Sequence, residues 1–316
     1  LTQIVMAQQA RSLAAEAVVT RVADLLADAH IEFVIVKGPA VSRLHPAGWA
    51  RTYNDIDLLV EPRRFGQALE LLLESGYDYP ATSLPPRPWF DRYCREGLNL
   101  LGAGNVDLHH HVAPWVFGAR LRSREVIDRA TCVQLRGRSV PVASAGHSSV
   151  IAALHILNDL WKGRRGLVSW RDLIVIIYRS GFATVREAFG ECGLVWLLDA
   201  VVATIRAHLP ELLGDVDTGP LRVPPRFAWR MRGLGWDRST PLSRHRLAWA
   251  LRLPLPQAGA FLFGSGLPSR QYIQIRHGTY RAYWSQAWSE TLSTIAGGDH
   301  RMERATPSEA PTRLSR

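Results

Sequence analysis

Cysteine and long apolar runs are both scarce in this sequence. The three cysteines, Cys94, Cys132 and Cys192, lie far apart and form no CxxC pair, so we expect neither a disulfide framework nor a structural zinc site. No apolar run approaches the roughly 20 residues of a membrane-spanning helix. Residues 1–11 also lack the basic flank and long apolar core of a secretory signal. The sequence therefore predicts a cytoplasmic protein with no membrane partner.

Lysine is almost absent. Only two of the 38 basic residues are lysines, Lys37 and Lys162, in a chain with a formal net charge of +10 and a pI near 10.1. Positive charge attracts polyanions, which makes nucleic acid, and tRNA in particular, a candidate partner. So strong an excess of arginine is also typical of a biased codon composition. The charge by itself therefore does not decide between these interpretations.

What the sequence does contain is enough apolar residues, 47% of 316, for about two domains with hydrophobic cores. In the first part of the chain, apolar periodicity and turn residues predict a mixture of helices and strands. The expected helices are residues 5–29, 40–44 and 62–75, and the expected strands are residues 31–36, 55–60, 97–101, 106–112 and a hairpin over 133–142.

Beyond about residue 144 the apolar spacing becomes helical. Helices are expected over residues 149–161, 167–179 and 194–209. Residues 210–270 are rich in Pro, Gly, Arg and Trp and have weaker periodicity. The sequence thus predicts a first domain of residues 1–143, a mainly helical domain of residues 144–295 and a polar, disordered tail of residues 296–316.

Two aspartates stand at alternate positions of the expected strand 55–60. Because successive side chains of a strand point to opposite faces, Asp55 and Asp57 share one face. Two carboxylates so close repel each other, and a divalent cation relieves that repulsion. Mg²⁺ is the usual ion where substrate phosphates complete the octahedron. The alternative is a pair of solvated aspartates at the start of a strand.

A third aspartate follows a tight turn in the next strand pair. Alternation puts Asp107, His109 and His111 on one face of the expected strand 106–112. A third carboxylate on a neighbouring strand is what two-metal phosphoryl transfer requires. The alternatives are a strand-edge aspartate and histidines on a rim. No Cys or Glu completes a zinc tetrahedron, so we place His109 beside the site and reject a structural zinc.

The segment before these aspartates carries groups that suit phosphate. Lys37 and Gly38 lie where a strand ends and a short helix begins, and such a turn offers backbone N–H groups and a helix N-terminus to an anion. Glycine permits close approach of a ligand. Lys37 adds a charge, Ser42 a hydroxyl and Arg51 a guanidinium suited to phosphate oxygens.

The second lysine gives a further phosphate-binding candidate. Helical spacing puts His155, Asp159 and Lys162 on one face of the expected helix 149–161 and its end. Lys162 is therefore a second lysine that could contact phosphate. A solvated helix end is the alternative.

Together these segments resemble a known family. The runs VIVKGPA at 34–40, NDIDLLV at 54–60 and VDLH at 106–109, with Arg51 between the first two, look like the uncharacterised bacterial nucleotidyltransferase branch of the DNA polymerase β superfamily. The likeness continues through residues 147–177 and 261–280. It implies an α+β fold in which a mixed sheet flanked by helices is followed by a mainly helical C-terminal domain.

The resemblance implies an enzyme that transfers a nucleoside monophosphate (NMP) group from an NTP, such as ATP, to an acceptor hydroxyl and releases pyrophosphate. Asp55, Asp57 and Asp107 would hold Mg²⁺, or Mn²⁺ in its place, and Asp107 would also help to deprotonate the acceptor. The nucleotide-binding residues would be Lys37, Gly38, Ser42, Arg51 and Lys162.

The chain departs from the superfamily at one position of the turn. Pro39 stands where a second small residue is usual, and proline has no N–H to donate. No metal ligand is lost, so we favour an active enzyme over a non-catalytic nucleotide-binding or interaction module. The acceptor stays open between a small molecule, a tRNA end and a protein; the last two include toxin-type transferases.

Overall fold

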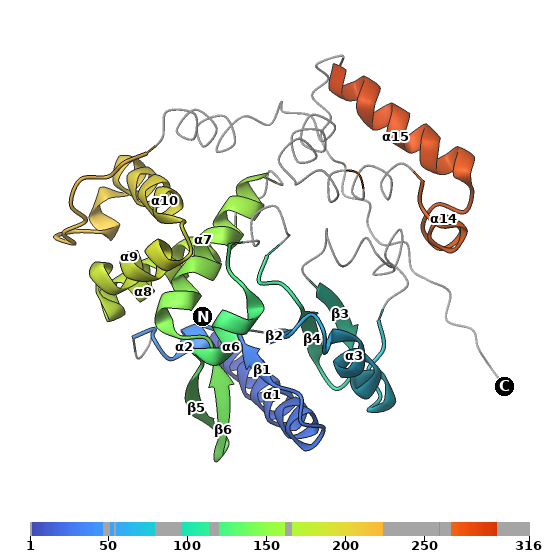
Figure 1. Cartoon of the computed structure of the whole chain (residues 1–316), viewed down its shortest axis with the longest axis horizontal. Coiled ribbons are helices and arrows are strands. Elements are labelled where there is room, and N and C mark those ends of the chain that lie inside the picture. The colour runs from blue at the N-terminus through green and yellow to red at the C-terminus, as the bar shows by residue number, and fades with distance from the viewer. Residues whose placement is uncertain are drawn as a thin grey trace.

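A single mixed sheet forms the centre of the molecule (Figure 1). The computed structural model describes residues 2–46, 51–53, 55–79, 97–113, 120–161, 166–223, 259 and 267–295. Within these residues the six strands of the sheet are ordered β3-β4-β2-β1-β6-β5. Their bounds are β1 (Phe33–Ile35), β2 (Asp55–Val60), β3 (Gly97–Leu101), β4 (Asn105–His109), β5 (Thr131–Leu135) and β6 (Arg138–Val142).

The pairing of the strands makes β2 a central strand. It runs parallel to β4 and antiparallel to β1, and β1 pairs in parallel with β6. The antiparallel hairpins β3–β4 and β5–β6 complete the two sides of the sheet. Apart from the exposed Asp55, every residue of β2 is buried, as expected for a strand whose two faces are both covered.

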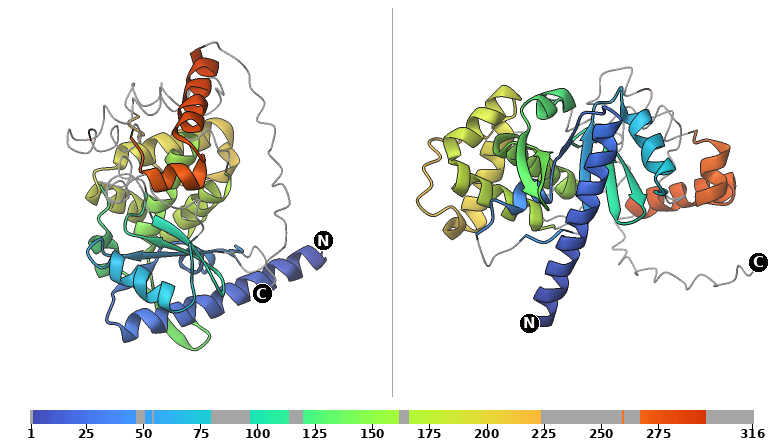
Figure 2. Two further views of the ribbon diagram at one scale, coloured as in Figure 1. Left: turned by 90° about the vertical axis from the view of Figure 1, so that its right-hand side faces the viewer. Right: turned by 90° about the horizontal axis from the view of Figure 1, so that it is seen from below.

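Helices cover both faces of the sheet. Figure 2 shows the long helix α1 (Thr2–Asp28) along one face, beside α3 (Phe65–Glu74), with most of the later helices on the other. Those helices are α7 (Ala145–Trp161), α8 (Val168–Ser180), α9 (Phe182–Glu191) and α10 (Val195–His208), followed by the 3-10 turn η2 (Pro210–Leu212). The remaining described helices are α2 (Pro39–Ser42), α6 (Ser123–Asp128), α14 (Arg270–Arg276) and α15 (Tyr280–Ile295).

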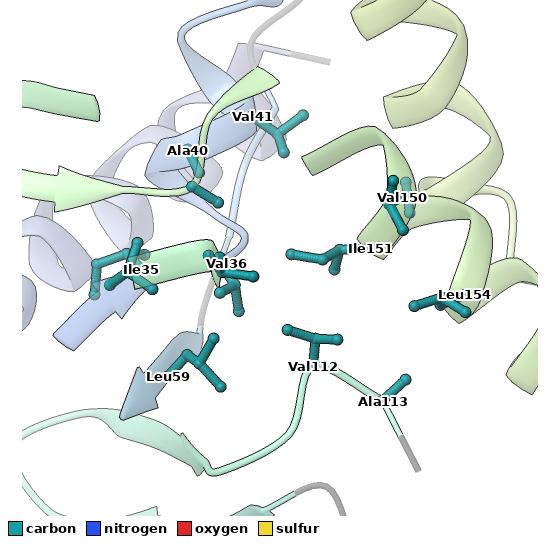
Figure 3. Packing of buried hydrophobic residues seen from close by; sticks show 14 of the residues in the cluster. Ile35, Val36, Ala40, Val41, Leu59, Val112, Ala113, Val150, Ile151 and Leu154 are labelled. Atoms are coloured by element: carbon teal, nitrogen blue, oxygen red, sulfur yellow. The ribbon is translucent and has the colours of Figure 1, made fainter. Parts of the chain in front are cut away.

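One continuous apolar cluster joins the sheet to the helical region. Figure 3 shows Leu59 of β2 and Val112 directed towards Ile151 of α7, with Val41 of α2 close by. All four side chains are at most 3% exposed. Since Leu59 has the same strand parity as Asp55 and Asp57, helix α7 packs on the face of β2 that carries the aspartates.

The fold agrees with the α+β architecture expected from the sequence, a mixed sheet with flanking helices and a helical region after it. Strands β2 and β3 have the predicted bounds, whereas β4 ends at His109 instead of Val112. The chain leaves the sheet there because Val112 and Ala113 pack against α7 (Figure 3). The short helices α6 and α9 were not predicted, because a helix of six to ten residues between turns shows little periodicity.

Much of the stretch 210–270, like the expected tail 296–316, lies outside the described residues. The division near residue 144 coincides with the start of α7, where the structure changes from strands to helices, and it stays a prediction. Among the helices that the structure describes, none combines the length and apolarity needed to cross a membrane.

Candidate active site

The parallel pairing of β2 and β4 builds the candidate site. The register places Asp57 directly beside Asp107 and Asp55 beside Asn105. Register partners on parallel strands point to the same face, so Asp107 joins the face that Asp55 and Asp57 share. The two predicted acidic segments, about 50 residues apart in sequence, therefore meet on neighbouring strands.

Asp57, Asp107 and His109 form a compact group. Their ligand atoms all lie within 4.8 Å of one another, and among the described residues this is the group of His, Cys, Asp and Glu side chains close enough to hold a metal ion. His109 Nε2 lies 3.2 Å from Asp57 Oδ1. Asp55, which the sequence also assigns to the metal, is exposed at the start of β2 and lies outside this group.

Asn99 is a site residue that the sequence analysis missed. Its Nδ2 donates a hydrogen bond to Asp107 Oδ1 at 2.6 Å. The signal was present in the hairpin, because a turn that pairs Leu101 with Asn105 also pairs Asn99 with Asp107. Asn99 therefore fixes the orientation of the Asp107 carboxylate with a neutral donor.

Lys37, which was expected to bind phosphate, lies at the site with its ammonium group against a carboxylate. Its Nζ is 2.7 Å from Asp57 Oδ1, so the aspartates have a fixed positive neighbour that the sequence did not reveal. Burial alone would raise the pKa of Asp57, which is 4% exposed, but the charge of Lys37 and the hydrogen bond from His109 outweigh it and hold that pKa well below its usual range. Asp57 is therefore an anion at any physiological pH.

Asp107 has the opposite electrostatic environment. Its burial raises the pKa of the carboxyl above the usual 3.8, and the negative charges of Asp57 and Asp55 add to the rise, while His109 and the Asn99 hydrogen bond oppose it. The influence of Asp55 agrees with its place on the same face. The site thus carries negative charge that its own residues do not fully neutralise.

The turn after β1 differs from the expected phosphate cradle. The N–H groups of Ala40, Val41 and Ser42 all donate to carbonyls of Lys37 or Gly38 within the turn, and α2 is a single helical turn. These amides are therefore already satisfied. Ser42 is half-buried, with its Oγ 3.5 Å from the Pro39 carbonyl.

Gly38 is required by the backbone and by its neighbour. Its φ is +52° with ψ −111°, a region that side chains disfavour. A Cβ there would also lie 3.2 Å from the ring of the buried Tyr53. Glycine at this position therefore serves the turn and the packing of Tyr53, whatever its role towards a nucleotide.

Arg51 is buried against the helical region. Its Nε donates to both oxygens of Asp172 on α8, at 2.9 and 2.8 Å, and His45 Nε2 lies 3.3 Å from the same carboxylate. Burial lowers the pKa of His45 more than Asp172 raises it. From the sequence, Arg51 was expected to contact the triphosphate and had no protein partner. Its ion pair joins the segment before β2 to the helical region.

The remaining candidate, Lys162, lies outside the described residues. The two residues expected to share its helical face, His155 and Asp159, are both half-buried on α7. The contact of Lys162 with a nucleotide therefore stays a prediction.

The donor set fits a divalent cation. Two carboxylates and one imidazole lie within the span of a single coordination sphere, and oxygen and imidazole donors are common ligands of divalent metals. The pKa of Asp107 is raised by burial first and by the charges of Asp57 and Asp55 second, and a bound cation would relieve both costs of ionising it. This combination of charge and spacing is able to bind metal and, through it, phosphate.

Comparison with known proteins identifies a family for most of the chain. The profile of a family described as "Uncharacterised nucleotidyltransferase" matches residues 1–210, which include all six strands and helices α7 to α10. A solved structure of an antigenic nucleotidyltransferase-like protein from Paracoccidioides brasiliensis is 17% identical, with a TM-score of 0.39, over 68% of this chain and 96% of that chain. No curated protein matches significantly.

Proposed function

The chain belongs to the uncharacterised nucleotidyltransferase family, and from that premise we propose that it transfers an NMP group from an NTP to an acceptor hydroxyl. The observation that carries the proposal is the pairing of Asp57 with Asp107 on parallel strands, with a surplus of negative charge between them. Phosphoryl chemistry needs such a charge to hold metal against a triphosphate.

Asp55, Asp57 and Asp107 are the proposed metal-binding carboxylates. A divalent cation held by them, Mg²⁺ or Mn²⁺, would supply charge stabilisation for the reacting phosphate and the leaving pyrophosphate. Asp57 is suited to a permanent ligand role because it is ionised throughout the physiological pH range. Asp107 is suited to a second role, because its carboxylate lies beside Asp57 on the neighbouring strand, where an acceptor hydroxyl held at the metal could pass its proton to it.

The transfer step follows from these roles. The acceptor oxygen forms a bond to the α-phosphorus, its proton passes to Asp107, and the bond between the α-phosphorus and the bridging oxygen breaks. Pyrophosphate leaves with that electron pair. Asn99 keeps the receiving carboxylate in place through its hydrogen bond.

Lys37, Gly38, Ser42, Arg51 and Lys162 are the proposed nucleotide-binding residues. Lys37 has the best support, because its ammonium already lies at the acidic group and a lysine side chain is flexible enough to turn towards phosphate. Arg51 would act from its ion pair with Asp172. The amides of residues 40–42 contribute little to this role, since the turn uses them itself.

The acceptor class is left to experiment, with a small molecule, a tRNA end and a protein side chain as the candidates. The full-length protein is incubated with each α-³²P-labelled NTP, Mg²⁺ or Mn²⁺, and each acceptor class, and both label transfer and pyrophosphate release are measured. We expect metal-dependent transfer that Asp55→Ala and Asp57→Ala abolish.

The matched control is Asp24→Asn, which removes an exposed carboxylate whose partner is Arg138 on the surface. This variant should transfer label at the wild-type rate. Near wild-type turnover by Asp57→Ala would contradict the proposal. Tight NTP binding without transfer to any acceptor class would favour a non-catalytic binding module.

A further inference from the structure

His109 brings a nitrogen donor into an otherwise carboxylate site. The His109 side chain is 6% exposed and lies at the end of β4, two residues beyond Asp107 and therefore on the same face. Its Nε2 is 3.2 Å from Asp57 Oδ1, and it belongs with Asp57 and Asp107 to the group whose ligand atoms lie within 4.8 Å. The sequence alone placed His109 beside the site, whereas the structure places it among the candidate ligands.

The spacing of these atoms, which includes a hydrogen-bond distance between His109 and Asp57, is also compatible with ligands on one ion. With metal–ligand bonds of about 2.1 Å, adjacent corners of an octahedron are about 3.0 Å apart and opposite corners about 4.2 Å apart. The 3.2 Å between His109 Nε2 and Asp57 Oδ1 matches an adjacent pair. The upper limit of 4.8 Å on the distances within the whole group is only slightly longer than the distance between opposite corners of the octahedron.

The donor type has a consequence for the ion. Mg²⁺ is bound almost entirely by oxygen and keeps much of its water, whereas imidazole is a good ligand for first-row transition metals. Mn²⁺ accepts carboxylate and phosphate oxygens as readily as Mg²⁺ does. A site with two carboxylates and one imidazole therefore favours a transition ion over Mg²⁺.

A second buried histidine shows that the arrangement is not a general feature of this fold. His45 Nε2 lies 3.3 Å from Asp172 Oδ1, nearly the same distance as His109 from Asp57. A cation pairs with the carboxylate at both places, Lys37 with Asp57 and Arg51 with Asp172, but among the described residues no second carboxylate joins the group at Asp172. His45 therefore serves as a control for His109, because it is a buried histidine at a similar distance from a carboxylate but outside the candidate metal site.

We propose that His109 is a direct metal ligand and that, together with Asp57 and Asp107, it makes the site selective for a first-row divalent transition ion, Mn²⁺ being the ion that also suits a triphosphate. The inference rests on the metal site of the proposed function and adds the class of cofactor. It concerns metal binding and therefore has readouts that do not depend on turnover.

The first test uses the wild-type full-length protein loaded with Mn²⁺. Pulsed electron paramagnetic resonance should detect coupling of the bound Mn²⁺ to an imidazole nitrogen, and this coupling should disappear in His109→Asn. It should persist in His45→Asn, the matched control. Bound Mn²⁺ without nitrogen coupling in the wild type would overturn the proposal, and this result needs no folded variant.

The second test measures selectivity by titrating Mn²⁺ and Mg²⁺ in competition. Mn²⁺ binds many oxygen sites more tightly than Mg²⁺, so the informative quantity is the change in the Mn²⁺ to Mg²⁺ affinity ratio between variants. His109→Asn should lower the Mn²⁺ affinity about tenfold or more, the scale seen even for residues that only support a ligand, and leave Mg²⁺ affinity nearly unchanged. Equal loss of both ions would overturn the ligand role and leave His109 as a positioning residue.

The two proposals fail in distinguishable ways. Nitrogen-coupled Mn²⁺ in a protein that transfers no nucleotide would contradict the proposed function and leave the metal site intact. Metal-dependent transfer by a protein whose bound Mn²⁺ shows no nitrogen coupling would refute only the role of His109.

Discussion

The helical region and the sheet both bury carboxylates, but they neutralise them differently. In the helical region each buried aspartate is paired with a guanidinium. Asp172 on α8 receives Arg51 at 2.8 Å, and Asp199 on α10 receives Arg186 at 2.7 Å. In each of these ion pairs one guanidinium neutralises one carboxylate.

In the sheet two carboxylates lie side by side. Asp57 receives the ammonium of Lys37, while Asp107, its register partner, is hydrogen-bonded by the neutral amide of Asn99. The pKa of Asp107 is raised, through burial first and through the charges of neighbouring aspartates second. Negative charge here exceeds what the surrounding residues neutralise.

The difference separates a structural role from a functional one. A buried ion pair with both partners present holds two segments together, although its net contribution to stability is small. A cluster of like charges costs stability, and such clusters with perturbed pKa values are typical of functional sites. We therefore place the proposed chemistry in the sheet and assign the helical ion pairs a structural role.

The largest expected effect is the loss of transfer in Asp107→Asn. The amide is nearly isosteric, so the strand should survive, but it neither accepts a proton at neutral pH nor binds a metal as an anion. Turnover should fall by orders of magnitude while Mg-NTP still binds through Asp55 and Asp57. Single-turnover kinetics and calorimetry check the two parts separately, and retained turnover would remove Asp107 from the mechanism.

The next effect concerns stability and the helical region. Arg186→Met keeps an apolar contact with Phe182 but leaves the Asp199 carboxylate, 1% exposed, without its cation. We expect a loss of about 3 kcal/mol in the free energy of unfolding, measured with urea. Adding Asp199→Asn should restore most of the loss. A change below about 1 kcal/mol would mean that water reaches Asp199 freely.

A smaller effect is expected on nucleotide affinity. Lys37→Met and Arg51→Met should each weaken Mg-NTP binding by about 1–3 kcal/mol, the scale of a charge-assisted contact. Arg186→Met is the control, because it removes an arginine from the other buried pair and should leave this affinity unchanged. If calorimetry finds unchanged binding in both test variants, the residues are structural and not phosphate ligands.

The smallest effect is a pH-dependent gain in stability by Asp107→Asn without metal. The pKa of Asp107 is raised in the folded state. Ionising this carboxyl therefore lowers the free energy of unfolding of the wild type above that pKa. Below the ordinary value of 3.8 the carboxyl is protonated in both states and the cost is absent. The variant should therefore melt at a slightly higher temperature at pH 7, and the gain should vanish as the pH falls towards 3.8. A gain that grows on acidification would contradict the raised pKa.

The sequence was sufficient to predict much of the sheet that carries the candidate site. The strand containing Asp55 and Asp57 was predicted with its bounds, because a short run that is apolar apart from these two aspartates stands between turn signals. The hairpin before Asp107 was predicted from its Gly-Ala-Gly-Asn turn. Both signals come from neighbouring residues, so they can be recognised without any knowledge of the fold.

What the sequence did not yield are contacts between segments far apart in the chain. Nothing local indicates that Arg51 meets Asp172, 121 residues later. His45 at the same carboxylate and Lys37 on Asp57 depend in the same way on how the segments pack. Asn99 is an exception, because the register of its own hairpin would have identified it.

By itself the sequence determined the class of fold and predicted the aspartates of the candidate site and the turn before them, because strand alternation and turn chemistry are set by neighbouring residues. The tertiary structure alone decided which charges meet. It paired β2 with β4 in parallel, brought His109 and Lys37 to Asp57, and engaged Arg51 with the helical region. Electrostatic pairing depends on distances in space and on burial, and both are fixed only when the sheet and the helices pack together.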